Sequence, residues 1–364
     1  MSNPKRIVYL FGAGSTQAEV DFQGGKIINL LMKKNDRGEG VAQRILTRGN
    51  FYKTLKIDST EEIDVEKLIS LLLSSGNVNY KNKAEKLREL YYEELVSGFN
   101  KTGILVNPEL SMGLLELHRC PIFNEHIEKL SGFIILNHDN LLQTASQRIY
   151  NCVNLGFKFH SKVINCANDE ELRSCPLVIK LYGSFDWRNK IPIEIEGLNS
   201  TSKYSKNMLW IPPSIRKETG DYPYNKLAGL AYELLAKRCD VLRVIGCSLS
   251  QNDWNVISLL FNSQYNQLLQ HKTCYRIELI MDQFYGKQIV DNCSYLQNLC
   301  SIEYLNDGDF SYYKEEDKGK MLPKTSDLDN PFKYWLKTKT KYHMVNKQLD
   351  IATASTLKKI VEET

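Results

Sequence analysis

The sequence predicts an α/β fold, an open parallel sheet with helices on both faces, and three observations carry this prediction. Short runs of continuous apolar residues recur along the chain, amphipathic stretches lie between them, and glycines directly follow the first run. Continuous rather than alternating apolarity is typical of strands buried on both faces of a parallel sheet. Their alternation with helices indicates a doubly wound arrangement, in which ligands bind at the carboxyl edge of the sheet.

The expected strands are five apolar runs, at residues 7–11 (IVYLF), 133–136 (FIIL), 177–181 (LVIKL), 241–245 (VLRVI) and 276–280 (RIELI). Apolar residues recur at helical spacing in three stretches between them, at residues 65–72, 87–95 and 227–235. Ser59 and Glu62 have the spacing of a capping box and predict the start of the first of these helices.

About 120 residues separate the first two runs, far more than a direct crossover needs. The excess predicts a helical insertion over roughly residues 25–130, covering the binding crevice of a domain that spans residues 1–310. Residues 311–364 then form a C-terminal extension that packs on the domain or on a partner subunit. Its cationic and aromatic residues are either a contact surface or a solvated basic segment: Lys333, Trp335, Lys337, Lys339 and Lys341.

The composition excludes several classes of protein. Lysine and arginine total 47 against 43 aspartates and glutamates, an excess too small to indicate a nucleic-acid-binding surface. The nine cysteines include no C-x-x-C pair, so the sequence predicts no metal site. The first apolar run is too short for a signal peptide, and no stretch is long enough to span a bilayer. We therefore expect a cytoplasmic protein that binds neither membranes nor nucleic acid.

Small or polar residues follow four of the expected strands. The first group is Gly12, Ala13, Gly14 and Ser15. Glycines here let the backbone approach a pyrophosphate, and N–H groups at the start of the next helix receive its charge. A turn that simply needs small residues explains the pattern equally well.

The second group, Asn137 and Asp139, follows the run at 133–136. Asn137 can orient a water or a ribose hydroxyl, and Asp139 can accept a hydrogen bond from a sugar hydroxyl. Alternatively, one of the two caps the next helix. The order of the groups along the chain is nevertheless that of a dinucleotide crevice.

The third and fourth groups are expected to complete that crevice: Gly183 and Ser184 after the third run, and Gly246, Ser248 and Asp253 after the fourth. Each group also has a plain structural explanation. The third fits a turn beside Trp187, and in the fourth the spacing of Ser250 and Asp253 fits a capping box.

These motifs in this order, GAGS, NHD followed by LL, KLYGSFDW and IGCSLSQND, resemble those of the sirtuin-like NAD-binding family, particularly its bacterial antiphage-defence branch. The resemblance covers about residues 5–310. It implies a Rossmann-like domain with a helical module that binds NAD+ as its substrate. It also implies cleavage of the nicotinamide–ribose bond to give nicotinamide and ADP-ribose. The four-cysteine zinc module of deacetylating members is absent from the sequence, so protein deacetylation is not expected.

By this resemblance Asn137 positions the attacking water, Asp139 holds the ribose, and a histidine stands where this chain has Tyr182. Ionising a tyrosine of pKa near 10 rather than a histidine of about 6.5 costs roughly 4 kcal/mol at pH 7, on the order of a thousandfold in rate. Three interpretations stay open. Tyr182 orients water through its hydroxyl, the chain is a natural binding-only relative, or the tyrosine is an engineered replacement. His138 is a less expected substitute base, since relatives with the same NHD keep the other histidine.

The resemblance also implies control by a partner, because unregulated loss of NAD is toxic to the cell. We expect a homo-oligomer, or control by a separate subunit such as a ring ATPase or helicase, in bacterial or archaeal abortive defence. The competing hypothesis is a catalytically inactive sensor of NAD or ADP-ribose, or a scaffold subunit of a defence complex.

Overall fold

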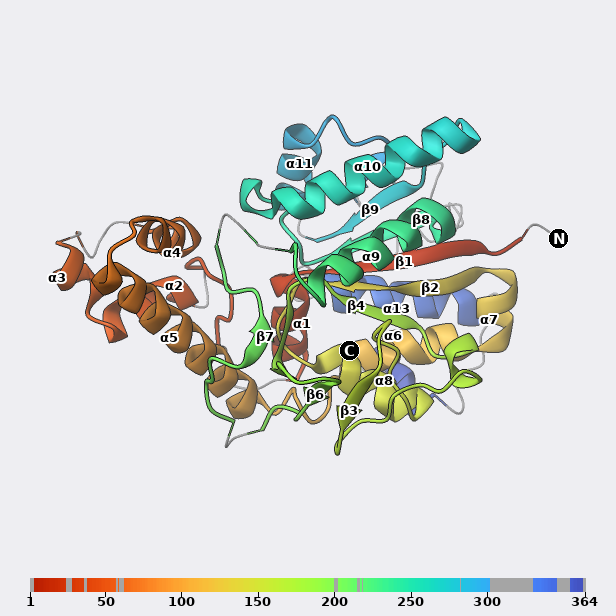
Figure 1. Cartoon of the computed structure of the whole chain (residues 1–364). Coiled ribbons are helices and arrows are strands. Elements are labelled where there is room, and N and C mark those ends of the chain that lie inside the picture. The colour runs from red at the N-terminus through yellow and green to blue at the C-terminus, as the bar shows by residue number, and fades with distance from the viewer. Residues whose placement is uncertain are drawn as a thin grey trace.

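The computed structural model describes residues 3–23, 28–35, 38–56, 58, 62–199, 202–214, 217, 219–281, 283–301, 330–345 and 354–362. Within these residues a six-stranded parallel sheet forms the centre of the molecule (Figure 1). Its strands are β1 (Lys5–Phe11), β2 (Glu128–Ile135), β4 (Leu177–Lys180), β8 (Val241–Ile245), β9 (Arg276–Ile280) and β10 (Leu299–Ser301). Their spatial order is β10-β9-β8-β1-β2-β4, which, when the six strands are numbered along the chain and read from β4, is 3-2-1-4-5-6. This is the order of a Rossmann-like fold and confirms the predicted fold class.

All five predicted strands are present. β8 and β9 have the predicted bounds, whereas β1 and β2 begin before their apolar runs. β2 and β4 each end one residue earlier than predicted. The sixth strand, β10, was not predicted, because three residues are too few to show a period.

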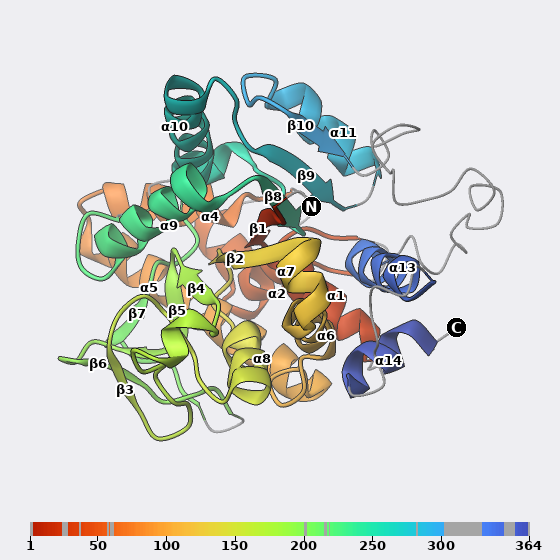
Figure 2. The ribbon, with the colours of Figure 1, turned by 90° about the vertical axis from the view of Figure 1, so that its right-hand side faces the viewer.

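Helices cover both faces of the sheet (Figure 2). On one face α9 (Tyr224–Arg238) packs against β1, β2 and β4, with α10 (Trp254–His271) beside it. On the other face α1 (Ala13–Phe22), α6 (Glu109–Arg119) and α13 (Pro331–Val345) pack against one another. The remaining helices of this body are α7 (Pro121–His126), α8 (Leu141–Tyr150), α11 (Gln283–Asn292) and α14 (Ser355–Glu362).

The two C-terminal helices, α13 and α14, belong to the main hydrophobic core through residues such as Phe332, Leu336 and Leu357. Trp335 and Lys339, two residues of the predicted contact surface, are buried within the chain itself. They are therefore not available to a partner, because the apolar side of α13 faces the sheet. Residues 311–329 of the predicted extension lie outside the described part of the chain.

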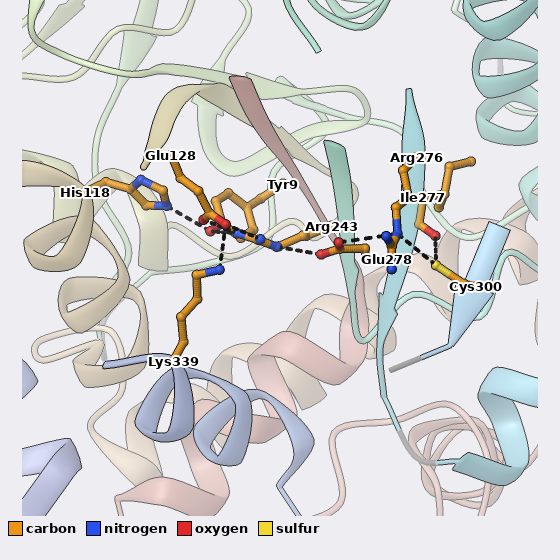
Figure 3. Close-up of polar contacts among 9 residues, drawn as sticks. All are labelled: Tyr9, His118, Glu128, Arg243, Arg276, Ile277, Glu278, Cys300 and Lys339. Carbon is orange, nitrogen blue, oxygen red and sulfur yellow. Dashed lines mark hydrogen bonds and ion pairs between the residues drawn. The ribbon is translucent and has the colours of Figure 1, made fainter. Parts of the chain in front are cut away.

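A buried ion network fixes α13 to the sheet (Figure 3). The Glu128 carboxylate accepts two hydrogen bonds from the Arg243 guanidinium, at 2.6 and 2.7 Å, and one from Lys339 Nζ at 2.6 Å. Arg243 Nε also donates to Glu278 at 2.9 Å, so two cations meet two carboxylates. Burial alone would raise the pKa of Glu128, but Arg243 and Lys339 outweigh it and hold that pKa well below its usual value. Such compensation is needed because an unpaired buried charge costs several kcal/mol.

A helical insertion lies beyond the carboxyl ends of the strands, to the left in Figure 1. It consists of α2 (Val41–Arg48), α3 (Phe51–Leu55), α4 (Val65–Ser74) and α5 (Val78–Thr102). The predicted capping box is wrong about where α4 begins, because Asp64 caps the helix and accepts a hydrogen bond from Lys67 N at 3.1 Å. Ser59 lies outside the described residues.

The insertion shares a second hydrophobic core with a small sheet that the sequence did not predict. This sheet has the order β3-β6-β5-β7 and consists of β3 (Phe159–Ser161), β6 (Ile193–Ile195), β5 (Gly183–Arg188) and β7 (Met208–Trp210). Phe185 and Trp210 supply the largest side chains from this sheet to that core. The insertion is therefore anchored beside the carboxyl edge of the main sheet.

Candidate functional site

The turn after β1 and the loop after β8 touch at the point where the strand order reverses. Gly12 N donates to Ile245 O at 3.0 Å, and Gly14 N donates to Gly246 O at 2.8 Å. A Cβ atom on Gly12 or Gly14 would lie 2.7 Å from the backbone of the β8 loop, so no larger residue fits at either position. Gly246 itself has φ +61°, a conformation that favours glycine. The predicted groups at Gly12 and Gly246 therefore form one glycine-lined contact.

Two of the N–H groups expected to receive a pyrophosphate already have backbone partners in this conformation. Gly14 N is bound to Gly246 O, and Ser15 N donates to Gly12 O at 2.9 Å. Ser248 is exposed beside this contact, in the loop that follows β8. A phosphate at this turn would therefore have to compete with hydrogen bonds inside the protein.

Asn137 and Asp139 reach back from the end of β2 to the same turn. The Asn137 amide nitrogen donates to Gly12 O and to Thr16 Oγ1, both at 2.8 Å. Asp139 accepts a 2.6 Å hydrogen bond from Thr16 Oγ1 and one of 3.1 Å from Leu141 N, at the start of α8. The structure thus brings the first two predicted groups together, with Thr16 between them.

A cavity of about 10 Å³ lies behind these side chains, enough for one water molecule but not for a nucleotide. Polar residues that the sequence did not single out line it, among them Glu19, Gln143 and Lys180. Burial raises the pKa of Glu19 to about 7, although two backbone N–H groups donate to its carboxylate. Within the described residues neither polar atom of the Gln143 side chain has a hydrogen-bond partner. Lys180 donates to the carbonyl oxygen of Asp139 and so fixes the loop after β2.

Gly183 and Ser184 hold the loops in place. Gly183 has φ +70° and packs so closely on Leu209 O that a Cβ atom would lie 2.2 Å from it. The buried Ser184 hydroxyl donates to His138 O at 3.0 Å. Ser184 therefore joins the loop after β2 to the small sheet, and Gly183 allows β5 and β7 of that sheet to pack closely.

Tyr182 is buried at the end of β4, and its hydroxyl has no hydrogen-bond partner in the part of the chain that the structure describes. Burial raises the pKa of Tyr182, and the nearby Asp253, Cys247 and Glu66 act in the same direction. Lys217 Nζ lies 4.7 Å from the centre of the Tyr182 ring. The hydroxyl therefore stays protonated at neutral pH.

Asp253 pairs with a cation rather than simply capping α10. Its carboxylate lies 2.8 Å from Lys217 Nζ and accepts a 3.0 Å hydrogen bond from Ser250 Oγ. Because Lys217 also lies over the Tyr182 ring, this ion pair connects Tyr182, which directly precedes the third predicted group, with Asp253 of the fourth.

The helical insertion brings a carboxylate to the same place. Glu66, in the first turn of α4, is half-buried beside Lys217 and Asp253. Burial raises its pKa, whereas Lys217 and a hydrogen bond from Asn252 lower it. Asn252 Nδ2 also contacts Asp64 at 3.3 Å. Sequence reasoning missed Glu66 and Lys217, because each carries no local motif and the contacts join segments far apart in the chain.

His138 is enclosed by aromatic rings and is not exposed at the carboxyl edge of the sheet. Its ring centre lies 5.1 Å from those of Phe185 and Trp210 and 6.5 Å from that of Tyr91. Burial, helped by Lys180 and Lys217, lowers the pKa of His138 to about 3. The imidazole is therefore neutral at pH 7 and far too weak a base to replace a catalytic histidine.

Among the described residues no group of three or more His, Cys, Asp or Glu side chains is placed to hold a metal ion. None of the described helices is both long and apolar enough to cross a membrane.

No protein-family model and no curated protein matches the chain. What this site can do chemically is therefore argued from the residues at the carboxyl edge of the sheet alone.

Proposed function

We propose that the chain binds NAD+ at the carboxyl edge of the sheet and hydrolyses the nicotinamide–ribose bond, as the sirtuin-like family does. The observation that carries this proposal is the convergence of four strand-end loops where the strand order reverses between β1 and β8. In sheets of this order a dinucleotide lies across that point. The glycines at positions 12, 14 and 246 let the turn after β1 and the loop after β8 meet, and a pyrophosphate bound there would take over the N–H groups of Gly14 and Ser15 from their partners within the protein.

The roles of Asn137 and Asp139 follow from their remaining hydrogen-bonding capacity. The Asn137 amide nitrogen is held by the turn after β1, so its carbonyl oxygen is the atom that accepts a hydrogen bond from the attacking water. The Asp139 carboxylate has further lone pairs with which to accept a ribose hydroxyl. Because the cavity beside them holds one water, binding of a nucleotide requires the segments that line the cavity to move apart.

The charged residues around Lys217 suit a cationic substrate. The ammonium group of Lys217 forms an ion pair with Asp253, and a second carboxylate, Glu66, is close enough for Lys217 to lower its pKa. Negative charge there favours the positively charged nicotinamide ring and an oxocarbenium-like transition state. Tyr182 is neutral and can only position groups through its hydroxyl, which makes this chain slower than one with a histidine.

The second candidate function is a binding module, a sensor of NAD or ADP-ribose that lacks turnover. The buried, protonated Tyr182 favours it, because neither Tyr182 nor His138 is a base of suitable pKa. In either case we propose a role in bacterial or archaeal antiphage defence, in which the chain acts as a homo-oligomer or under a partner ATPase or helicase. Depletion of NAD would then abort the infection.

The test is nicotinamide release from NAD+ by the purified chain, compared with its Tyr182→His and Tyr182→Phe variants. We expect slow release by the chain itself and up to about a thousandfold faster release by the histidine variant. Loss of activity in the phenylalanine variant would assign the positioning role to the hydroxyl. Binding of NAD+ without release by any of the three supports the sensor, and the absence of both binding and release contradicts the proposal.

A further inference from the structure

Helix α10 exposes a stripe of large apolar side chains along one face. Five residues form it, with exposed fractions from 36% to 68%: Trp254, Phe261, Tyr265, Leu268 and Leu269. Their spacings of seven, four, three and one place them on one side of a helix. The opposite side buries Val256, Ile257 and Leu260 in the core.

A helix on the surface of a soluble protein normally turns its large apolar side chains toward the core and its polar side chains toward solvent. At 150–250 Å² for a whole aromatic side chain, the exposed parts of the three aromatic residues alone amount to on the order of 300 Å². A contiguous apolar patch of that size on a soluble protein marks an interaction site. The stripe runs for about 22 Å, at 1.5 Å per residue from Trp254 to Leu269, so residues around it must supply the rest of the roughly 800 Å² that each partner buries in an interface of standard size.

The chemistry of this face fits a second copy of the same chain. None of the 18 residues of α10 is Asp, Glu, Lys or Arg, although a quarter of the whole chain is charged. In a two-fold contact residue i of one copy meets residue j of the other and j meets i, so a face that carries charge of one sign would repel its copy, whereas an uncharged face does not. Exposed polar residues of the same helix, such as Asn255, Asn262 and Gln270, carry side-chain amides that both donate and accept hydrogen bonds. Such groups can pair with one another across a two-fold axis.

We propose that the exposed face of α10 is the homodimer interface of this protein, packed against α10 of a second copy. This proposal does not depend on the proposed function. Phe261 lies near the middle of the stripe, so a two-fold axis there places it against Phe261 of the other copy. Because α10 begins directly after Asp253, the interface starts at the edge of the candidate site.

The experiment is sedimentation of the full chain from about 1 to 100 µM, with Phe261→Glu as the test variant. Leu71→Glu is the matched control, because Leu71 is 66% exposed on helix α4. We expect a dimer whose dissociation constant rises by about 100-fold in Phe261→Glu and stays unchanged in the control. Because Phe261 is exposed, its replacement leaves the fold intact, which circular dichroism checks.

A charge-swap mixture then identifies the partner surface. Phe261→Glu and Phe261→Lys chains are each expected to be monomers, whereas their equimolar mixture recovers the dimer because opposite charges meet across the axis. A monomeric parent chain at 100 µM, or equal effects of the test and control variants, overturns the proposal. A dimer that Phe261→Glu weakens but the mixture does not restore also overturns it, since α10 would then face a different surface.

Discussion

Replacing Gly246 with alanine tests the contact on which the candidate site depends. In the structure Gly246 has φ +61°, and its Cβ atom would lie 2.2 Å from Ser15 N and 2.5 Å from Gly14 Cα. The left-handed conformation costs about 1 kcal/mol for a residue with a side chain. Relieving the overlap needs a movement of about 1 Å, which breaks the hydrogen bond from Gly14 N and adds roughly 2–3 kcal/mol. We therefore expect a total loss of about 3–4 kcal/mol in the free energy of unfolding.

Urea denaturation followed by circular dichroism measures this loss, with Gly229→Ala as the matched control. Gly229 is exposed within helix α9, and a Cβ atom there would meet no described residue from outside the helix within 4 Å. Alanine at this position should raise stability by up to about 1 kcal/mol through helix propensity. If Gly246→Ala is as stable as the parent chain, the turn after β1 does not touch the β8 loop, and the proposed dinucleotide crevice loses its geometric basis.

Three further outcomes follow from the structure. Asn137→Ala should lower the free energy of unfolding by about 2 kcal/mol, measured by urea denaturation, because two 2.8 Å hydrogen bonds to the turn are lost; no loss would mean that the amide is free. Glu128→Gln should cost about 3–5 kcal/mol at pH 7, because Arg243 and Lys339 lose the charged carboxylate that both contact, although Arg243 keeps Glu278. Since the pKa of Glu128 is lowered on folding, this cost should shrink as the pH falls below about 4.5, and a cost independent of pH would contradict the ion network. Glu66→Gln should reduce the preference for NAD+ over NADH by about fivefold, because the positively charged nicotinamide ring loses a negative neighbour. Calorimetric titrations measure this preference, with Asp64→Asn as the control. Equal effects of both variants would show that Glu66 does not act on the nicotinamide ring.

The strands and the glycine turn were predictable because their signals are local. A fully buried strand must be apolar along its whole length, and β8 and β9 show this directly in their own residues. The placement of Asn137 beside Gly12 was also predictable, because the carboxyl ends of parallel strands meet at one edge. The short strand β10 and the small sheet were not predictable, since runs of three residues carry no period.

The sequence by itself determined the order of the elements and the residues that end each strand. Only the tertiary structure decided what those residues contact. It buried Tyr182 beneath Lys217, bound the amide nitrogen of Asn137 to a turn, and brought Glu66 from the insertion to Asp253. The physical reason is that burial, charge pairing and pKa depend on neighbours from distant parts of the chain, which no local pattern encodes.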